Sequence, residues 1–477
     1  MKKAVILFFY FITFSAFSQE LVKDVRFKIP KKSDVFQIIE ENDKRVSLFF
    51  CNKKNITSVR FNERFEIIDS LAFTKPEKNL DEIVGYSISN NKYYTYWASS
   101  NNKEFVSQCF DYGQNKVIQN NYALDFEKEK AIKKITINNV FYLVTVSKSS
   151  SILNFYVFNE GSFSKKVVDM SERVFYNRDN KKETLWNIFG VATTMENPFT
   201  IQSISNDSPA SLTFSACKRK CYSYDNEFVI TLDNNKNCTQ YISVNLLDFT
   251  FKTIFFNQPT IVNNVDLSSD SNSFFIDKNV VQMKLNSDNM AITVKDLDNK
   301  EIKSYKAFDD KEVEFKNSEI YQENKGVKNL RVLDNSNQLL HKIYFQNPSM
   351  SCYNNNGVNY ITLGSISTLE NNNAVMYGGM IGGFTGALIG AALTSNYSMN
   401  NVNSYQNRKV VYVNCLFDTN FNHVTGDAKK LAFDKLRNFI EDHKELENKT
   451  AFKFDSALFF GGFNKETDNY SIYKFID

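Results

Sequence analysis

A turn pattern that recurs along the whole chain constrains the fold more than any other feature of the sequence. In each copy a predicted strand ends in Phe or Leu, Asp or Asn follows within the turn, and a second strand begins a few polar residues later. Asp and Asn suit such turns because their side chains bond the backbone ahead of them and tolerate turn geometry. Each copy therefore predicts a β-hairpin. The eight copies are centred on Phe61, Phe110, Phe158, Leu247, Leu297, Leu333, Phe417 and Phe463.

The spacing of these copies predicts the architecture. They follow one another after 49, 48, 89, 50, 36, 84 and 46 residues. Most of the steps are close to one four-stranded propeller blade, which takes about 40 to 50 residues. Abundant Phe and Tyr with few Pro and Gly also favour strands. The chain resembles a β-propeller at the level of architecture, without the signature of a named family. We expect an all-β, propeller-like fold of six to eight blades, with seven as the central prediction and tandem β-sandwiches as the alternative.

The first residues have the pattern of a cleaved secretory signal. Two lysines are followed by an apolar run over residues 4–14, and Ala16 and Ser18 are small residues at the positions that signal peptidase recognises. The run is too short for a membrane-spanning helix, which needs about 20 residues. We therefore expect cleavage before Gln19. With this signal, the chain resembles an exported bacterial β-propeller, and we expect it in the periplasm, in the outer envelope or outside the cell.

The two longest steps between turns predict insertions into the ring. The 89-residue step contains Cys217 and Cys221, and the 84-residue step contains a glycine-rich stretch. The expected organisation is a signal peptide at 1–18, a propeller-like body at 19–364, an inserted segment at 365–404 and closing strands at 405–477. A helix is expected within the last part, over residues 427–446. Its start is capped by Asp427, and its apolar face contains Ala432, Leu436, Phe439 and Ile440.

Residues 374–394 form an uncharged segment with a stripe of glycines at every fourth position. On a helix this stripe makes a flat face, which in membranes favours helix association. In water each glycine costs a helix about 1 kcal/mol relative to alanine. The alternatives are a membrane-spanning or inserted helix, self-association of soluble copies, and internal packing. Turns on both sides of the segment argue against a single crossing, which would separate the last two blades from the ring. The predicted glycine-zipper face contains Gly378, Gly382, Gly386 and Gly390.

Seven cysteines remain after the predicted cleavage, and an odd number leaves at least one without an intramolecular partner. Cys51, Cys109 and Cys415 lie in apolar runs and are expected to be core thiols. Two of Cys217, Cys221 and Cys238 are close enough in sequence for a disulfide, with free thiols as the alternative. Three cations, Lys218, Arg219 and Lys220, lie between the first two of these cysteines. They would lower a thiol pKa, but a structural bridge beneath a solvated basic loop is favoured.

The sequence contains few candidates for chemistry. It has no G-x-S-x-G elbow, phosphate-binding loop or H-E-x-x-H pair, and its three histidines are not at ligand spacing. The segment that begins at Asp418 starts like a calcium loop but has His423 and Lys429 where Gly and Glu are required, so a turn is favoured. The S-x-x-K match at Ser162 lies in a predicted hairpin. No catalytic residue, metal site or cofactor is therefore expected.

These features favour an exported, non-catalytic binding or envelope-associated protein, with a protein or glycan as its ligand. Without the signal peptide the chain is nearly neutral, which gives no electrostatic reason to expect nucleic-acid binding. One alternative is an exported hydrolase or lyase that acts on polysaccharide or peptide with acids from several blades. Another is a membrane-inserted assembly or sensor component that uses residues 374–394. Membrane contact and self-association through this segment are both open.

Overall fold

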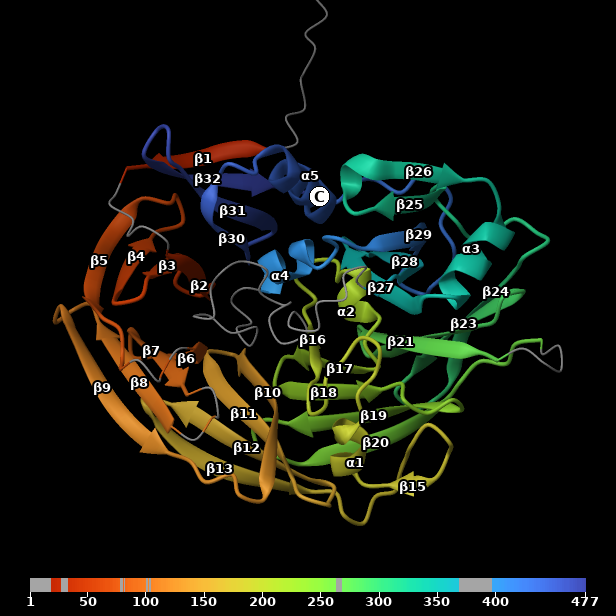
Figure 1. The fold of residues 1–477 in the computed structure, drawn as a ribbon, viewed down its shortest axis with the longest axis horizontal. Helices are drawn as coiled ribbons and strands as arrows, with labels where there is room; N and C mark the ends of the chain where they lie inside the picture. The colour runs from red at the N-terminus through yellow and green to blue at the C-terminus, as the bar shows by residue number, and fades with distance from the viewer. Residues whose placement is uncertain are drawn as a thin grey trace, which may run out of the picture.

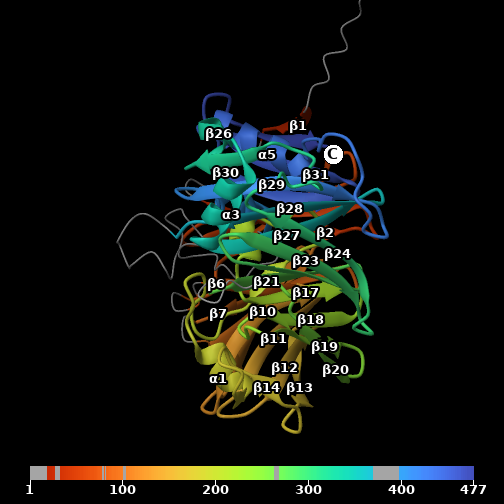
Figure 2. The ribbon, with the colours of Figure 1, turned by 90° about the vertical axis from the view of Figure 1, so that its right-hand side faces the viewer.

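The computed structural model describes residues 19–26, 33–77, 80, 82–99, 102, 104–262, 268–368 and 397–477. Within these residues, seven sheets of four or five strands stand around a common centre (Figure 1). Figure 2 shows the same ring turned by 90°. The fold is an all-β propeller with seven blades, the number that the turn repeat favours. The predicted signal peptide at 1–18 and the glycine-zipper face lie outside the described residues.

The first three blades are meanders in which the strands follow one another from the centre outward (Figure 1). Blade 1 contains β2 (Asp34–Glu40), β3 (Arg45–Cys51), β4 (Asn55–Phe61) and β5 (Ile67–Thr74). Blade 2 contains β6 (Glu82–Ser89), β7 (Lys92–Ala98), β8 (Glu104–Asp111) and β9 (Lys116–Ala123). Blade 3 contains β10 (Glu129–Ile137), β11 (Val140–Ser147), β12 (Ile152–Asn159) and β13 (Ser162–Asp169).

Blades 4 and 5 follow the same order, with one extra strand at the inner edge of blade 4. The connection from blade 3 contains β14 (Phe175–Tyr176), β15 (Lys182–Glu183), α1 (Leu185–Gly190), β16 (Gln202–Ile204) and α2 (Leu212–Ser215). The short β16 is parallel to β17 and extends the blade 4 sheet. Blade 4 continues with β17 (Arg219–Tyr224), β18 (Glu227–Leu232), β19 (Cys238–Asn245) and β20 (Phe251–Asn257). Blade 5 contains β21 (Asp270–Ile276), β22 (Asn279–Leu285), β23 (Asn289–Asp296) and β24 (Glu301–Phe308).

Blade 6 is built out of chain order, as β26-β25-β29-β28-β27. Its outer strands β25 (Ile320–Asn324) and β26 (Leu330–Leu333), joined by η1 (Val327–Asn329), come first in the chain. Helix α3 (Ser336–Tyr344) then leads to β27 (Asn347–Asn355) and β28 (Val358–Ile366). After the second insertion, which contains α4 (Tyr397–Asn403), the chain returns as β29 (Lys409–Phe417) between β28 and β25.

Blade 7 closes the ring with strands from both ends of the chain. It contains β30 (Glu447–Phe454), β31 (Ala457–Asn464) and β32 (Asn469–Phe475), preceded by α5 (Ala432–Asp442). The N-terminal β1 (Glu20–Val25) pairs antiparallel with β32 and forms the outer edge of this sheet. Closure of this kind joins the first described strand to the last and leaves the ring without a break between blades 7 and 1.

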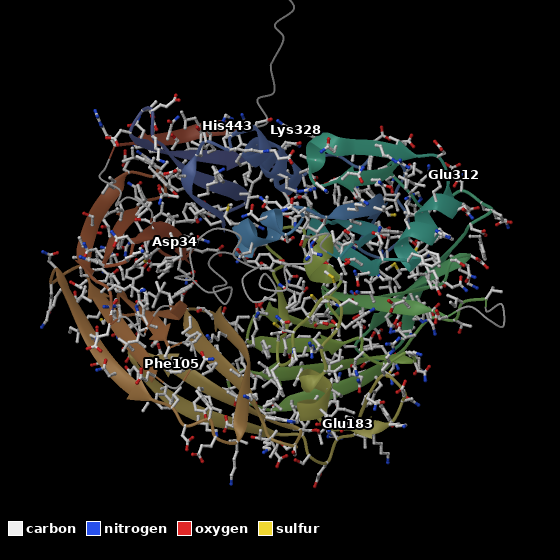
Figure 3. The ribbon with its side chains drawn as sticks, in the orientation of Figure 1. Asp34, Phe105, Glu183, Glu312, Lys328 and His443 are labelled. Carbon is white, nitrogen blue, oxygen red and sulfur yellow. The ribbon has the colours of Figure 1, made fainter. Side chains whose placement is uncertain are left out.

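The hydrophobic core lies between neighbouring blades. In β3 every residue from Val46 to Cys51 is buried, because both faces of the strand pack against another blade. Between blades 1 and 2, the Phe49 ring stacks on Phe36 at 4.6 Å and meets Phe110 edge-on at 5.2 Å between centroids. Figure 3 shows side chains filling the space between the sheets all around the ring. The abundance of phenylalanine in the sequence is explained by these inter-blade layers.

Six of the eight predicted hairpins are confirmed. They connect β4 to β5, β8 to β9, β12 to β13, β19 to β20, β23 to β24 and β31 to β32. The expected side-chain bonds are present in these turns. Asn62 Oδ1 accepts the backbone N–H groups of Arg64 and Glu66 at 2.9 Å each. Asp248 Oδ1 accepts the N–H of Thr250 at 2.9 Å.

The hairpins predicted at Leu333 and Phe417 are wrong. Leu333 ends the outermost strand of blade 6 and is followed by α3. Phe417 ends β29, which already has a neighbour on each side, so the sheet has no place for the next strand. Only an isolated bridge from Phe417 to His423 forms after that turn. Both errors come from the altered strand order of blade 6.

The predicted C-terminal helix is present but shorter than residues 427–446. All four residues of the predicted apolar face are buried in α5, and Phe439 contacts the rings of Phe460 and Tyr473 at 5.5 and 4.6 Å. Asp427 is not the cap, because the N–H of Ala428 is bonded to the carbonyl of Asn317 at 2.8 Å and α5 begins only at Ala432. Asp434 instead accepts the N–H of Leu431 at 3.0 Å and fixes the start of the helix.

Candidate functional site at the centre of the ring

The two insertions that the long steps predict meet at the centre of the ring. Helix α2 comes from the connection between blades 3 and 4, and α4 comes from the connection between β28 and β29. Figure 1 shows both helices inside the circle of sheets. Ser211 of the first insertion and Ser404 of the second are far apart in the chain but meet here. No local sequence pattern predicts this contact.

Asn401 and Tyr405 hold the first insertion at this centre. Asn401 is completely buried; its Oδ1 accepts the N–H of Ser211 at 2.6 Å, and its Nδ2 donates to the carbonyl of Pro209 at 2.8 Å. The hydroxyl of Tyr405 accepts the N–H of Leu212 at 2.9 Å. Burial raises the pKa of Tyr405 to about 12, so this hydroxyl stays protonated at neutral pH. These bonds satisfy N–H groups at the start of α2 that the helix itself cannot pair.

Three hydroxyl groups complete the contact between the insertions. Thr213 Oγ1 donates to the carbonyl of Ser404 at 3.0 Å, and the hydroxyls of Ser404 and Ser211 are 2.8 Å apart. Ser211 also caps α2 by accepting the N–H of Phe214 at 3.2 Å. The centre of the ring is therefore a dense polar seam in which backbone groups of one insertion are paired by side chains of the other.

The base of the second insertion is fixed to blade 6 on both sides. The Ser367 N–H donates to the carbonyl of Lys409 at 2.9 Å, and Ser367 Oγ accepts the N–H of Lys409 at 2.9 Å. Arg408 Nη1 donates to the carbonyl of Ser367 at 2.7 Å. The residues before and after the insertion thus stand side by side at the same end of the β28–β29 pair.

A buried arginine organises the first insertion. The Arg219 side chain is 2% exposed and faces Glu196, which is 3% exposed, with Nε and Oε1 3.3 Å apart. Glu196 also accepts the N–H of Arg219 at 2.9 Å and that of Lys218 at 3.0 Å. A guanidinium offers five donors, so it can serve a carboxylate and several carbonyls together. Its remaining N–H groups donate to the carbonyls of Ile188, Phe189, Val191 and Asn197.

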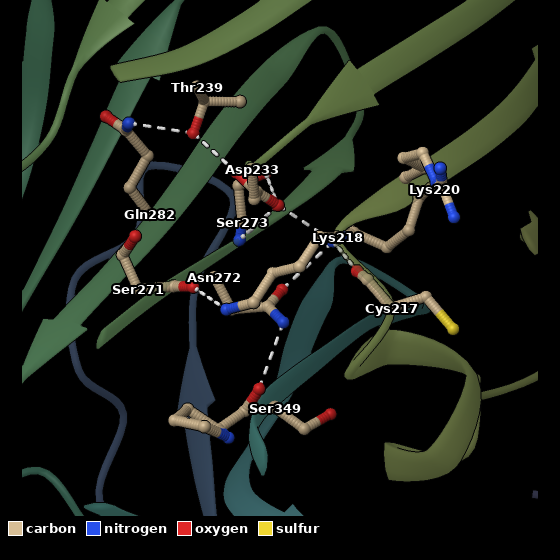
Figure 4. A network of polar contacts seen from close by, with 12 residues as sticks. Cys217, Lys218, Lys220, Asp233, Thr239, Ser271, Asn272, Ser273, Gln282 and Ser349 are labelled. Carbon is tan, nitrogen blue, oxygen red and sulfur yellow. Dashed lines mark hydrogen bonds and ion pairs between the residues drawn. The ribbon is translucent and has the colours of Figure 1, made fainter. Parts of the chain in front are cut away.

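A second buried network joins blades 4, 5 and 6 behind α2 (Figure 4). The Lys220 ammonium is completely buried and donates to Asp233, Asn272 and the carbonyl of Cys217. Asp233 lies at the end of β18, and Asn272 lies on β21 of the next blade. Asn272 in turn donates to the carbonyl of Pro348 on β27 at 3.0 Å. Each charged group in this network has a partner of opposite charge or an amide oxygen.

A third buried pair fastens α5 to blade 6. The Arg437 guanidinium donates to both oxygens of Glu323, at 3.1 and 2.6 Å, and Tyr412 donates to the same carboxylate at 3.1 Å. The guanidinium carbon also lies 4.0 Å from the ring centroid of Tyr405, the residue that holds α2. The central seam is therefore connected through Tyr405 to the helix beside the closing blade.

The cysteines that were predicted to form a disulfide are unpaired. Cys217, Cys221 and Cys238 are separate buried thiols. Their sulfurs face different groups: Cys217 the carbonyl of Thr213 at 3.9 Å, Cys221 the hydroxyl of Ser203 at 3.6 Å, and Cys238 the side-chain oxygen of Asn235 at 3.5 Å. The structure contains no bridge among these three thiols. Cys51, Cys109 and Cys415 are buried, as predicted.

The basic run between Cys217 and Cys221 is not a solvated loop. Arg219 and Lys220 are buried in β17, and each of the three cations has its own carboxylate; the third pair is Lys218 with Asp270 at 2.8 Å. Burial raises the pKa of the Cys217 thiol and that of the Cys221 thiol above the ordinary value of a cysteine. The cations therefore do not create an activated thiolate, because their charge is already compensated.

The described residues contain no group of three or more His, Cys, Asp and Glu side chains that could hold a metal ion. The turn after β29 uses the Asp418 carboxylate itself, which accepts the N–H groups of Asn420 and Asn422 at 2.8 Å each. Ser162 and Lys165 lie in the β12–β13 hairpin, as predicted, and Lys165 pairs with Glu129. Across the described ranges, no helix has the length and apolar character that crossing a membrane requires.

An open, charged cavity lies at the rim of blade 1, away from the central seam. Its volume is about 310 Å³. It is formed at the β2–β3 and β4–β5 turns, and its lining carries both positive and negative side chains. The lining residues are Asp43, Lys44, Arg45, Asn62, Glu63, Arg64, Glu66 and Ile68.

Comparisons with known proteins assign no family. No protein-family model matches the sequence, and no curated protein is significantly similar to it. Among solved structures, a protein from Lactobacillus plantarum has a TM-score of 0.27 and 6% identity, covering 67% of this chain and 78% of its own. Hydrazine synthase from Kuenenia stuttgartiensis has a TM-score of 0.28 and 9% identity over 94% of this chain and 96% of its own. A cobalt-substituted Synechocystis ACO has a TM-score of 0.29 and 8% identity over 55% and 58%. At these scores the similarities assign no function.

Proposed function

We propose that the chain is an exported, non-catalytic β-propeller that associates with the cell envelope, and that residues 374–394 provide its contact with a membrane. The observation that carries the proposal is the fixed base of the second insertion. Ser367 and Lys409 are bonded to each other, and Asn401 of α4 is bonded to Ser211 at the ring centre. The β28–β29 pair thus holds the two ends of the second insertion side by side, and an insertion that leaves and returns on the same side fits membrane insertion without crossing.

The position of β1 supports export with cleavage before Gln19. The strand begins at Glu20, one residue beyond the predicted cleavage site, and it supplies the outer edge of the closing blade. Removal of residues 1–18 therefore leaves every strand of the ring intact. N-terminal sequencing of the protein recovered from outside the cytoplasm is expected to begin at Gln19; an uncleaved N-terminus would contradict this part of the proposal.

The contacts of the three buried carboxylates support the non-catalytic part of the proposal. Asp233, Glu196 and Glu323 are each engaged by a buried cation and by further donors. Such acids have almost no contact with solvent, whereas a general acid or base for an external substrate has to reach that substrate. The non-catalytic assignment is thereby supported for these three carboxylates, the most deeply buried ion-pair acids of the described chain.

Membrane contact is tested by removing the apolar segment. A variant with a short Gly-Ser linker in place of residues 369–396 is expected to keep the melting temperature of the full protein, because the central seam and the bonds between Ser367 and Lys409 remain. The full protein should require detergent for extraction from the envelope, and the variant should be recovered in the aqueous fraction. Recovery of both proteins in the aqueous fraction would refute the proposal.

A matched substitution separates membrane insertion from self-association. Replacing Gly378, Gly382, Gly386 and Gly390 by leucine keeps the apolar length but removes the small-residue face. Insertion depends on apolar surface, so this variant is expected to stay with the membrane. Self-association through a close helix approach depends on the glycines. A variant that becomes both aqueous and monomeric would show that contact between copies, and not the bilayer, retains the protein.

A further inference from the structure

Lys220, Asn272 and Asp233 meet in a dry site between blades 4, 5 and 6 (Figure 4). The side chains of Lys220 and Asp233 are both 0% exposed, and Asn272 is also 0% exposed. Lys220 Nζ lies 2.9 Å from Asp233 Oδ2 and 3.0 Å from Asn272 Oδ1. Its third contact is the carbonyl of Cys217 at 2.6 Å. An amine, a carboxamide and a carboxylate are thus held together without exposure to solvent.

The neighbours of these groups fix their orientation. Asn272 Nδ2 donates to the carbonyl of Pro348 at 3.0 Å, which leaves the amide oxygen facing Lys220. Asp233 Oδ2 accepts the N–H and the hydroxyl of Ser273 at 3.0 and 2.8 Å, and Oδ1 accepts the hydroxyl of Thr239 at 2.8 Å. The reacting groups therefore do not have to be ordered in a further step, and pre-ordering removes a large part of the barrier of such a reaction.

We propose that Lys220 and Asn272 form an intramolecular isopeptide bond. The Nζ of Lys220 attacks the side-chain carbonyl carbon of Asn272, a new N–C bond forms, and the bond from that carbon to Nδ2 breaks. Nδ2 leaves as ammonia with its own two protons and one proton from the lysine. Of the two other protons of the initial ammonium, one remains on the new amide nitrogen and one passes to Asp233. No oxidant, reductant or other reactant is consumed.

Asp233 has the role of proton carrier. Moving one proton along its 2.9 Å contact with Nζ converts the buried ion pair into a neutral amine and a carboxylic acid. The attack proceeds from this neutral form, in which Lys220 and Asp233 carry no charge. The amine then has a free lone pair for the attack, and the carboxylic acid can supply the proton that the leaving nitrogen needs. The reaction takes place once in each molecule, so even a slow rate is sufficient.

The bond would join blade 4 to blade 5 covalently. Lys220 lies on β17 and Asn272 on β21, the first full strands of the two blades. A covalent link between them limits the freedom of the unfolded chain, in the manner of a disulfide but without sensitivity to reduction. The chain has no disulfide among its described cysteines. An isopeptide bond would give an exported ring a covalent tie that these thiols do not provide.

Mass spectrometry of tryptic peptides from the purified mature protein tests the bond directly. The expected product is a branched peptide that joins residues 220 and 272, has lost the mass of one ammonia, and is not cleaved after Lys220. Recovery of the two regions as separate, unmodified peptides would overturn the proposal.

Three substitutions define the chemistry, and one serves as a control. Lys220→Arg and Asn272→Ala each remove a reacting group, so the branched peptide should be absent. Asp233→Asn keeps the shape but removes the proton carrier, and it too should lack the link; a linked Asp233→Asn protein would overturn the assigned role of Asp233. Lys218→Arg is the matched control, because Lys218 contacts Asp270 and the carbonyl of Ser271 instead of an amide side chain. It should retain the branched peptide in full.

Discussion

Arg219 and Lys220 are adjacent in the chain, yet each is buried beside a different carboxylate, Glu196 or Asp233. Removing one partner of such a pair leaves a buried charge without compensation, which costs far more than the loss of an exposed pair. At the scale of single residues, the stability of the first insertion and of blade 4 therefore depends on a few buried charged side chains. The sequence showed three cations in a row, but it could not show their carboxylates, because these lie 13 or more residues away or on another strand.

The Arg219→Ala variant is expected to lose about 3–5 kcal/mol of unfolding free energy, because Glu196 stays buried and four carbonyls lose their donor. Urea denaturation measures this loss. Arg26→Ala is the control, since Arg26 and Asp468 form an exposed pair with side chains 77% and 66% accessible; it should change stability by less than about 1 kcal/mol. Equal effects of the two substitutions would contradict the structural role of Arg219.

The seven thiols are expected to be unreactive in the folded protein. All seven are buried, and burial raises the pKa of each one, that of Cys238 to about 11. Because a thiolate is the reactive species, maleimide at mildly alkaline pH should label the native protein very slowly and all seven thiols after unfolding in urea. Rapid native labelling of Cys217 or Cys221 would show that the basic run activates a thiol after all.

At the scale of elements, a hairpin was predictable from the sequence only where neighbouring strands in the chain are also neighbours in the sheet. The hairpins at Phe61, Phe110 and Phe158 were predictable because consecutive strands pair there. Leu333 and Phe417 carry the same local signal, but β29 enters blade 6 from a distant part of the chain. The apolar face of α5 was predictable from its period, whereas its first residue depends on the bond between the N–H of Leu431 and Asp434. The meeting of α2 with α4 had no local signal.

Phe439 is expected to account for most of the attachment of α5. Its ring is 3% exposed and packs on Phe460, Tyr473 and Phe475 of blade 7. Phe439→Ala should destabilise the protein by about 3–5 kcal/mol, since it creates a cavity between helix and sheet. Thermal unfolding followed by circular dichroism measures the effect. Asp442→Asn, on the same helix in an exposed pair with Lys328, should have little effect; a comparable loss in both variants would be inconsistent with this packing.

At the scale of the whole molecule, closure by β1 joins the two ends of the described chain in one sheet. Deletion of residues 20–25 leaves the edge of β32 unpaired, and an exposed edge of this kind promotes association with other chains. The deletion variant is expected to melt at a lower temperature and to aggregate, as light scattering would detect. Appending residues 20–25 after Asp477 through a short turn should restore both properties, because Glu20 pairs opposite Lys474 near that end. A deletion without effect would contradict closure of the ring by β1.

The meeting of the two insertions at the centre of the ring is tested most directly by an engineered disulfide. The hydroxyls of Ser211 and Ser404 are 2.8 Å apart. The double variant Ser211→Cys with Ser404→Cys is therefore predicted to form a bridge, which peptide mapping by mass spectrometry identifies. The control pair Ser211→Cys with Ser162→Cys, in which the second position lies in a blade 3 hairpin, should remain unbridged. A 211–404 pair that stays reduced under oxidising conditions, in a protein that is still folded, would contradict the central seam.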